Sequence, residues 1–294
     1  MNNIRSNRHF LLVGIILSMI TWGISWPSAK ILSSYGGPFE IAWLRFVFTF
    51  LGVFVLLQIA GIPIRIDKKG MPSLAAASVL MTTYSLLFFS GLKNGLAGAG
   101  GVLVTTTTPL ITFLVGLFFS FRKLRPREWA GLFLGITGGC FLLSIWNRYD
   151  QILASGNIFF LGSTVVWAFL SRFTAKAGQY GAAPAFSLWI YLNCIFLLAF
   201  FVDWQALKLI LVQGDFRFWF NMLFNAVINT GMATTFYFYA TSKLGAEKTS
   251  TFIYIVPFAA ALSSLLLLGE PLHWNTVVGG LLGILAVYII NRRK

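Results

Sequence analysis

The 294-residue chain is 57% hydrophobic and 17% aromatic, and only 10% of its residues are charged. A single soluble core cannot bury that much apolar surface, so the composition excludes a soluble domain and indicates a membrane protein. The net charge is +14, but the basic residues occur in short clusters between apolar runs, as residues that flank membrane spans do, and this argues against nucleic acid as a partner.

Apolar stretches of about 20 residues, the length that crosses a bilayer, recur along the chain. They lie near residues 10–33, 40–60, 72–92, 95–120, 128–146, 156–176, 184–202, 217–241, 246–268 and 273–291. The first follows basic residues as a signal peptide would, but it is long enough for a full span, and we expect it to be retained. We therefore predict an all-α membrane protein of ten transmembrane helices.

The basic residues separate into two groups when ten spans start from a cytoplasmic N-terminus. The inner side then holds Arg5, Arg8, Arg65, Lys68, Lys69, Arg122, Lys123, Arg125, Arg127, Arg172, Lys176, Lys243, Lys248, Arg292, Arg293 and Lys294. The outer side holds only Lys93, Arg148, Lys208 and Arg217. The positive-inside rule therefore predicts a multi-pass protein of the inner (cytoplasmic) membrane with both termini in the cytoplasm.

The two halves of the chain resemble each other, because residues 109–139 align without a gap with residues 257–287. Matched pairs include Pro109 with Pro257, Gly131 with Gly279, Gly135 with Gly283, Ser25 with Ser171, Lys30 with Lys176, Pro38 with Pro184 and Trp43 with Trp189. Five spans per half is an odd number, so the second half enters the membrane from the opposite face. We predict two inverted five-helix repeats, 1–146 and 147–294, with a substrate held between them.

Three motifs carry a resemblance to a known family: WGISWPSAK at 22–30, WLRF at 43–46 and LGEPLHWNTVVGGLLGILAV at 268–287. They resemble the drug/metabolite transporter (DMT) superfamily, in particular its ten-helix EamA-type branch of metabolite exporters. The first half has SFRKLRPREWAG at 120–131 where that family's Gly-Glu turn is expected. The resemblance implies a transporter but names no substrate, since members carry amino acids, nucleotide sugars, polyamines and other solutes on one scaffold.

Two basic residues, Lys30 and Arg45, fall inside apolar runs. Charge within the membrane is costly, so such residues are candidates for substrate binding. Both lie near the outer ends of their helices, and a long side chain there can also reach the headgroups without any ligand. The match of Lys30 with Lys176 favours a functional role for Lys30, whereas both interpretations stay open for Arg45.

Polar and aromatic residues within the spans supply the other candidates for substrate binding. Asn221, Asn225 and Asn229 recur every four residues, so they share one helix face that contacts either a cavity or a neighbouring helix. Many aromatic residues belong to the interfacial belts, but some lie well inside the spans. The predicted substrate-binding residues are Trp22, Trp26, Lys30, Arg45, Tyr84, Asn225, Asn229, Tyr237 and Tyr254.

No Asp, Glu or His lies at the middle of a predicted span, so we expect transport without obligatory proton movement. The two cysteines, Cys140 and Cys194, lie in apolar runs and indicate neither a disulfide nor a metal site, and no cofactor is expected. The sequence also lacks HExxH and GxSxG motifs, which argues against a membrane enzyme.

A cationic pocket without acids suits an anionic group. We predict alternating-access transport of a small polar metabolite by a monomer or homodimer in the lipid bilayer. An amino acid or related carboxylate, moved by export or exchange, is the leading hypothesis. The alternatives are a nucleotide-derived or phosphorylated metabolite, or a lipid-type flippase, which needs a lateral opening for acyl chains.

Overall fold

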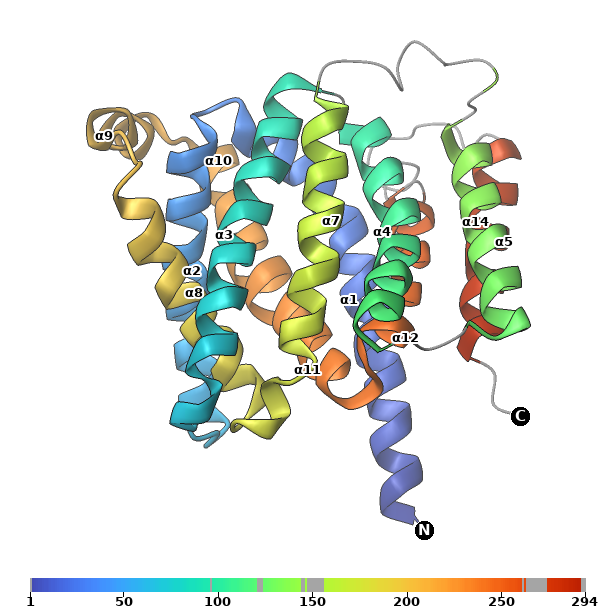
Figure 1. Cartoon of the computed structure of the whole chain (residues 1–294). Coiled ribbons are helices and arrows are strands. Elements are labelled where there is room, and N and C mark those ends of the chain that lie inside the picture. Colours follow the sequence, from blue (N-terminus) through green and yellow to red (C-terminus); the bar gives the residue numbers. More distant parts are fainter. Residues whose placement is uncertain are drawn as a thin grey trace.

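The computed structural model describes residues 2–95, 97–120, 124–143, 146, 156–260, 262 and 274–291. Within these ranges the chain is helical and forms no β-strand, and Ile66 and Gly181 make an isolated bridge between two loops. Most of the helices run side by side in one bundle (Figure 1). The expectation of an all-α fold is confirmed.

The first half of the chain contributes five helices. They are α1 (Asn2–Ser33), α2 (Pro38–Ile59), α3 (Met71–Asn94), α4 (Ala97–Ser120) and α5 (Pro126–Leu143). Pro38 lies in the first turn of α2, where a missing N–H costs nothing because that group has no intrahelical partner. A short 3₁₀ turn, η1 (Lys68–Gly70), precedes α3, and the Asp67 carboxylate accepts a hydrogen bond from the Lys69 N–H at its start.

The second half is more interrupted. It contains α7 (Asn157–Thr174), η2 (Ala177–Gln179), α8 (Ala183–Ala199), α9 (Trp204–Gln213), α10 (Phe216–Leu223), η3 (Phe224–Thr234), α11 (Thr235–Leu244), α12 (Ala246–Thr251), η4 (Phe252–Ile255) and α14 (Trp274–Asn291). The Gly-Glu-Pro-Leu motif of the last helix pair lies outside the described residues. Every predicted span that the structure describes contains helix, but the eighth is a composite of α10, η3 and α11.

Five helical segments in the described chain are long and apolar enough to cross a membrane, and a sixth would be counted if α8 and α9 were one span. These two helices, however, meet at a bend of 115°. The sequence placed no helix between residues 202 and 217. There, Asp203 accepts hydrogen bonds from the Gln205 and Ala206 N–H groups and so starts α9, which lies across the end of the bundle (Figure 1). The structure thus supports several membrane spans, while ten spans and inverted repeats stay predictions.

Glycines bring α5 and α14 into close contact at one edge of the bundle (Figure 1). A Cβ on Gly138 would lie 2.8 Å from the Gly279 carbonyl oxygen, and one on Gly131 would lie 2.3 Å from a side-chain carbon of Ile290. Small residues that let two helix backbones approach are typical of membrane helix pairs. These glycines therefore serve close packing of the two helices.

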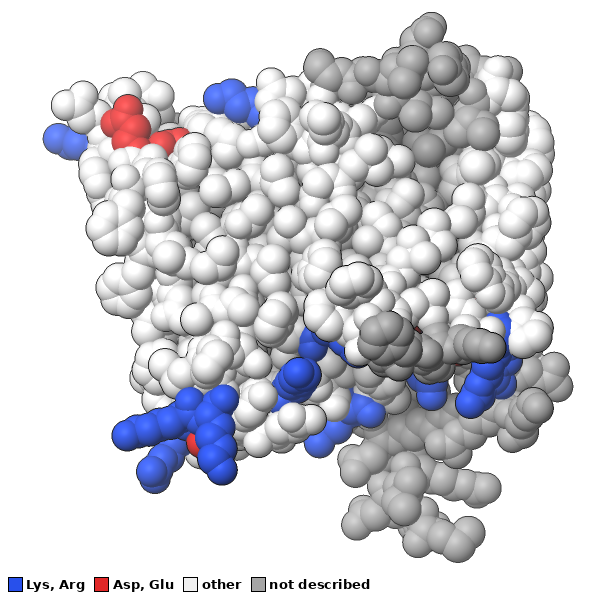
Figure 2. All heavy atoms as spheres, viewed as in Figure 1, with Lys and Arg blue, Asp and Glu red and all other residues white. Residues whose placement is uncertain are grey.

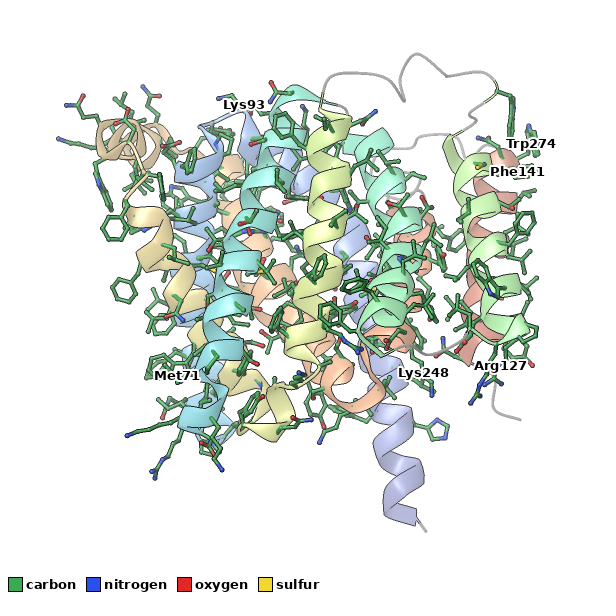
Figure 3. All side chains as sticks on the ribbon, in the orientation of Figure 1. Met71, Lys93, Arg127, Phe141, Lys248 and Trp274 are labelled. Atoms are coloured by element: carbon green, nitrogen blue, oxygen red, sulfur yellow. The ribbon has the colours of Figure 1, made fainter. Side chains whose placement is uncertain are left out.

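Basic side chains gather at the end of the bundle where the chain begins, and the opposite end shows few of them (Figure 2). Figure 3 places Arg127 and Lys248 at this basic end and Lys93 at the other. Between the two ends the visible surface is almost free of charge (Figure 2). That distribution is the one a membrane-spanning protein requires.

Candidate functional site

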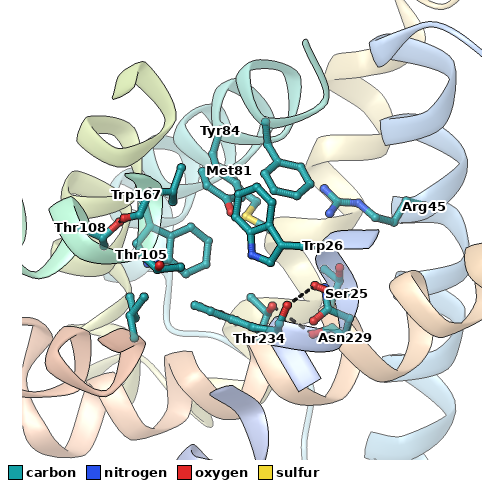
Figure 4. Close-up of a pocket in the computed structure, with 15 residues that line it drawn as sticks. Ser25, Trp26, Arg45, Met81, Tyr84, Thr105, Thr108, Trp167, Asn229 and Thr234 are labelled. Atoms are coloured by element: carbon teal, nitrogen blue, oxygen red, sulfur yellow. Dashed lines mark hydrogen bonds between the residues drawn. The ribbon is translucent and has the colours of Figure 1, made fainter. Parts of the chain in front are cut away.

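A small pocket lies inside the bundle, and residues from both halves of the chain line it (Figure 4). The first half contributes Trp22, Ser25, Trp26, Arg45, Met81, Tyr84, Phe88, Val104, Thr105 and Thr108. The second half contributes Trp167, Asn229, Thr230, Thr234 and Ile253. Its free volume is about 50 Å³, far below the roughly 300 Å³ of an ordinary small-molecule site. In this structure the pocket is therefore too small for an ordinary small-molecule ligand.

Aromatic rings form one wall of this central pocket. The Trp22 ring meets the Trp167 ring edge-on at 5.2 Å, and Tyr84 lies 4.6 Å from Trp167. Trp26 contacts Phe88 edge-on at 5.0 Å. These residues come from α1, α3 and α7, so the wall joins both halves and offers ring faces to an apolar group or to a cation.

Arg45 supplies the positive charge of the pocket. Its side chain is only 4% exposed, and its guanidinium carbon lies 5.0 Å from the ring centres of Phe46 and Phe89. Nη2 donates a 2.7 Å hydrogen bond to Ser85 Oγ, whereas Nε is buried without a partner. Within the described chain Arg45 forms no ion pair. A buried cation without a carboxylate partner is costly, and an anionic ligand would offset that cost.

Three further polar atoms at the pocket are buried without a hydrogen-bond partner in the described structure. They are the indole Nε1 atoms of Trp22 and Trp167, which can only donate, and Oδ1 of Asn229. Buried polar groups are normally paired, so unpaired ones on residues that line a cavity are candidates to bind a ligand. The pocket thus combines donors, an acceptor and aromatic faces.

Helix α4 lines the pocket with threonines just before Pro109. Thr105 donates to the Gly101 carbonyl at 2.7 Å, and Thr108 donates to the Val104 carbonyl at 2.6 Å. Because their hydroxyl protons are used within the helix, both can present mainly acceptor lone pairs to the pocket. Both threonines therefore bond the backbone of their own helix.

The opposite wall is η3, an 11-residue π-helical segment in the middle of the eighth predicted span. Asn229, Thr230 and Thr234 face the pocket from it. Its wider turns were not anticipated from the sequence, which was interpreted as an ordinary helix. Short π-helical insertions are frequent at functional sites because they redirect side chains and leave backbone groups to other partners.

This winding separates the asparagines that the sequence placed together. All three are buried, as expected. Asn221 donates to the Arg217 carbonyl at 2.7 Å, and Asn225 donates to Ser28 Oγ of α1 at 2.6 Å. Only Asn229 lines the pocket. Asn225 thus takes the interhelical packing role that was left open for it.

Lys30 lies outside the pocket lining. Its ammonium group donates to the carbonyl oxygens of Leu92 and Gly95, the latter at 3.0 Å, and both belong to the C-terminal end of α3. The expectation that Lys30 faces the cavity is not met in this conformation, because the carbonyls at a helix C-terminus attract the cation. Lys176, its match in the repeat, lies exposed before η2.

The predicted site residues therefore fall into two groups. Trp22, Trp26, Arg45, Tyr84 and Asn229 line the pocket. Tyr237 lies behind it, 5.0 Å from the Trp22 ring, and Tyr254 packs against Gly135 of α5. Substrate contact by any of these residues stays a prediction.

The sequence interpretation missed several lining residues, among them Met81, Phe88, Thr230, Thr234 and Ile253. Trp167 was not among the predicted substrate-binding residues either. Apolar or small polar side chains in a membrane span carry no signal that separates lining from packing. Ser85 likewise gains its importance only from the position of Arg45 on the neighbouring helix.

An ion pair connects α7 and α12 on the side of the pocket toward the basic end. Arg172 Nη1 lies 3.0 Å from Glu247 Oε1, with side chains 28% and 19% exposed. Glu247 also abuts Gly116 of α4, where an added Cβ would lie 2.3 Å from Oε1. The pair thus joins three helices.

The described residues contain no cluster of three or more His, Cys, Asp or Glu that could bind a metal.

Comparison with known proteins gives the family. The model of the EamA-like transporter family matches residues 9–144 and 154–292. An uncharacterized transporter of Bacillus subtilis, YoaV, is 24% identical, covering 97% of this chain and 99% of its own. A probable amino-acid metabolite efflux pump of Salmonella typhimurium is 22% identical over 93% and 92% of the two chains.

A third relative, a probable terminal-alkyne amino-acid exporter of Streptantibioticus cattleyicolor, is 20% identical over 95% of this chain and 92% of its own. One solved crystal structure superposes with a TM-score of 0.71 at 17% identity, covering 94% of this chain and 96% of that one, and it supports the fold alone. The family match spans nearly the whole chain. This multi-pass membrane protein belongs to the EamA-like transporter family.

Proposed function

We propose that the protein transports a small metabolite with an anionic group, most simply an amino acid or a related carboxylate. The observation that carries this proposal is Arg45, a buried cation that lines the central pocket and has no ion pair in the described chain. A guanidinium is opposite in charge to a carboxylate, and the two planar groups can form bidentate hydrogen bonds. A bound carboxylate would replace the missing counter-charge.

The rest of the pocket supports a zwitterion better than a phosphorylated compound. An ammonium group could rest on the faces of Trp26 and Tyr84 or donate to Asn229 Oδ1. A phosphate carries close to two negative charges, whereas Arg45 is the one Lys or Arg among the lining residues. An amino acid therefore remains the leading substrate class, and a nucleotide-derived or phosphorylated metabolite the second.

Alternating access is supported by the size and position of the pocket. A free volume of about 50 Å³ is too small for such a substrate, so helices must move apart to admit it. Because both halves of the chain line the pocket, movement of one half against the other would open it. Two relatives are named for efflux or export of amino-acid compounds, which supports export as the direction.

The proposed orientation places the basic end of the bundle in the cytoplasm, in an inner membrane. Single cysteines at the exposed positions Ser34 and Lys68, in a background without Cys140 and Cys194, test it in intact cells. A membrane-impermeant maleimide should label only the cysteine at Ser34. Equal labelling of both positions would refute the orientation.

The lipid-flippase alternative has one observation in its favour, an apolar cleft of about 830 Å³ that opens at the side of the bundle. The central pocket and this cleft use different residues of η3, with Asn229, Thr230 and Thr234 on the pocket side and Ile228, Met232 and Ala233 on the cleft side. A lipid in the cleft is thus separated from Arg45 by a helix. Metabolite transport remains our proposal.

Ligand stabilisation of the purified protein in detergent tests the substrate class, because a ligand that binds the folded state raises its melting temperature. The panel contains amino acids, other carboxylates, phosphorylated metabolites and polyamines. We expect amino acids or carboxylates to stabilise the protein, the effect to be lost in Arg45→Gln, and Arg65→Gln, an exposed arginine of a loop, to behave as wild type. Stabilisation by polyamines alone, or unchanged stabilisation of Arg45→Gln, would overturn the proposal.

A further inference from the structure

The lateral cleft lies between α1, α2, α8 and the η3–α11 segment, apart from the central pocket. Its volume of about 830 Å³ exceeds that of the pocket many times over. Its wall is largely apolar, and Leu17, Val53, Leu57, Met232, Phe236 and Tyr239 represent it. An apolar cavity of this size inside a bilayer would be filled by hydrocarbon, because lipid is the surrounding solvent.

The cleft is open to the side of the bundle. Leu17 of α1 is 57% exposed, Leu56 of α2 39% and Met232 of η3 48%. These residues lie within predicted spans, so their free surface faces acyl chains. A chain can therefore enter laterally from one leaflet without crossing the protein.

The length of the cleft matches one leaflet. Ile228 lies near the middle of its span, and Lys243 ends the same wall at the basic end of the molecule. The 15 residue steps from Ile228 to Lys243 correspond to about 22 Å of helix at 1.5 Å per residue, and one leaflet with its headgroup region is about 20–22 Å thick. An acyl chain lying along this wall would reach the midplane with its headgroup beside Lys243.

Lys243 provides the charge for such a headgroup. Its side chain is exposed, its ammonium lies 5.8 Å from the centre of the Tyr239 ring, and in the described chain it forms no ion pair. Lys176 lies two residues before Gly178, and η2 packs against α11 so that a Cβ on Gly178 would lie 3.5 Å from Ser242 Oγ. Lys243 thus lies at the basic end of the cleft, which forms its mouth, and Lys176 lies two residues from the lining residue Gly178 on a neighbouring element.

Small residues keep this mouth open. Small residues from η2 to the start of α8 line the cleft beside Lys243, namely Gly178, Gly181, Ala182 and Ala183. Gly181 has φ of +144°, a conformation that favours glycine, and an added Cβ would lie 2.8 Å from the Arg65 carbonyl oxygen. The segment before α8 is thereby held against the loop between α2 and η1.

We propose that the cleft binds one anionic phospholipid, with an acyl chain against the η3–α11 wall and the headgroup phosphate at Lys243. The cationic rim selects an anionic over a zwitterionic headgroup, and juxtamembrane lysines attract anionic lipids in this way. The apolar wall distinguishes the site from one for a free phosphate. The site lies behind η3, so it is separate from the substrate pocket and does not depend on the proposed substrate.

Native mass spectrometry of the full-length protein in a neutral detergent, titrated with phosphatidylglycerol or phosphatidylcholine, tests the site. We expect one tightly retained phosphatidylglycerol per chain, with affinity at least tenfold above that for phosphatidylcholine. Lys243→Gln should lose about tenfold in affinity for phosphatidylglycerol. Lys69→Gln, another exposed lysine at the basic end, is the matched control and should change it less than twofold.

Ala182→Phe fills the mouth of the cleft without touching a charge, and it should weaken both lipids. Melting curves establish that each variant is folded. Equal retention of the two lipids, or equal losses in Lys243→Gln and Lys69→Gln, would overturn the proposal. So would a dimer that carries no lipid and is dissociated by Ala182→Phe, because the cleft would then be an interface between two copies of this chain.

Discussion

Arg45 of α2 donates a 2.7 Å hydrogen bond through Nη2 to Ser85 Oγ of α3. The bond orients a guanidinium that lines the central pocket while its Nε is left without a partner. In the described chain, therefore, a neutral hydroxyl and not a carboxylate fixes the position of the charge. This arrangement holds the cation in place and leaves its charge available to a ligand.

Ser85→Ala should weaken substrate binding although the serine is not among the pocket-lining residues. Loss of one hydrogen bond to a charged group corresponds to on the order of 1.5 kcal/mol, or about tenfold in Kd. Thr83→Ala, which removes a hydroxyl that bonds only the Val79 carbonyl of its own helix, is the control. Isothermal titration of the ligand found by the stabilisation screen measures both. Equal affinities in the two variants would refute the positioning role.

Arg45→Met should make the ligand-free protein more stable. Replacement of a buried charge without a counter-charge by an apolar side chain of similar length removes a desolvation cost, which we expect to outweigh the lost hydrogen bond to Ser85. For comparison, replacing a buried ion pair by apolar side chains often stabilises a protein by about 1–4 kcal/mol. Thermal unfolding in detergent measures the change, with Arg65→Met as an exposed control. A lower melting temperature in Arg45→Met would mean that the guanidinium serves the fold.

Lys30→Met should lower the stability of the protein, in contrast to Arg45→Met, and should leave ligand affinity unchanged. The ammonium group satisfies the Leu92 and Gly95 carbonyls at the end of α3, and loss of charge-assisted bonds to buried acceptors costs about 1.5–3 kcal/mol. Lys93→Met, an exposed lysine at the same end, is the control. A well-folded Lys30→Met protein with tenfold weaker binding would restore Lys30 to the substrate site.

Large parts of the fold could be predicted from the sequence because hydropathy and charge are local signals. The apolar runs located most of the described helices within a few residues, although they missed α9. The π-helical winding of η3 could not be predicted in the same way. It depends on tertiary partners such as Thr49, which donates to the Ala226 carbonyl, and Tyr191, which bonds Thr230 and Thr235.

The same limit applies to the candidate site. Arg45 was identified because charge inside a membrane is rare, and the same reasoning selected Lys30, whose partners turned out to be backbone carbonyls. Any residue type can supply a backbone carbonyl at a helix end, so no sequence pattern predicts these partners. For Trp167, its position in the aromatic wall follows only from the packing of α7 against α1 and α3.

Gly138→Ala should destabilise the α5–α14 contact. Its Cβ would lie 2.8 Å from the Gly279 carbonyl oxygen, a backbone atom that cannot rotate away, and overpacking of this kind costs about 1–3 kcal/mol. Gly162→Ala in α7 is a matched control, since its nearest contact is an ordinary 3.4 Å to Leu87. There the higher helix propensity of Ala should leave stability equal or higher. Similar melting temperatures for both variants would contradict the close packing.

The Arg172–Glu247 pair should hold the basic end of the pocket closed. It joins α7 to α12 at 3.0 Å, and Gly116 beside it lies about 12 Å further along α4 than Thr108 of the pocket. A partly exposed pair contributes about 0.5–1 kcal/mol, so Glu247→Gln should populate the open form two- to fivefold more. A cysteine introduced as Thr108→Cys, with Cys140 and Cys194 replaced by Ala, reports this as faster labelling by a maleimide from the basic side. The charge-swapped variant Arg172→Glu with Glu247→Arg keeps an ion pair and should return labelling to the slow rate. Equal labelling rates in the background protein, Glu247→Gln and the charge-swapped variant would show that the pair does not close the pocket.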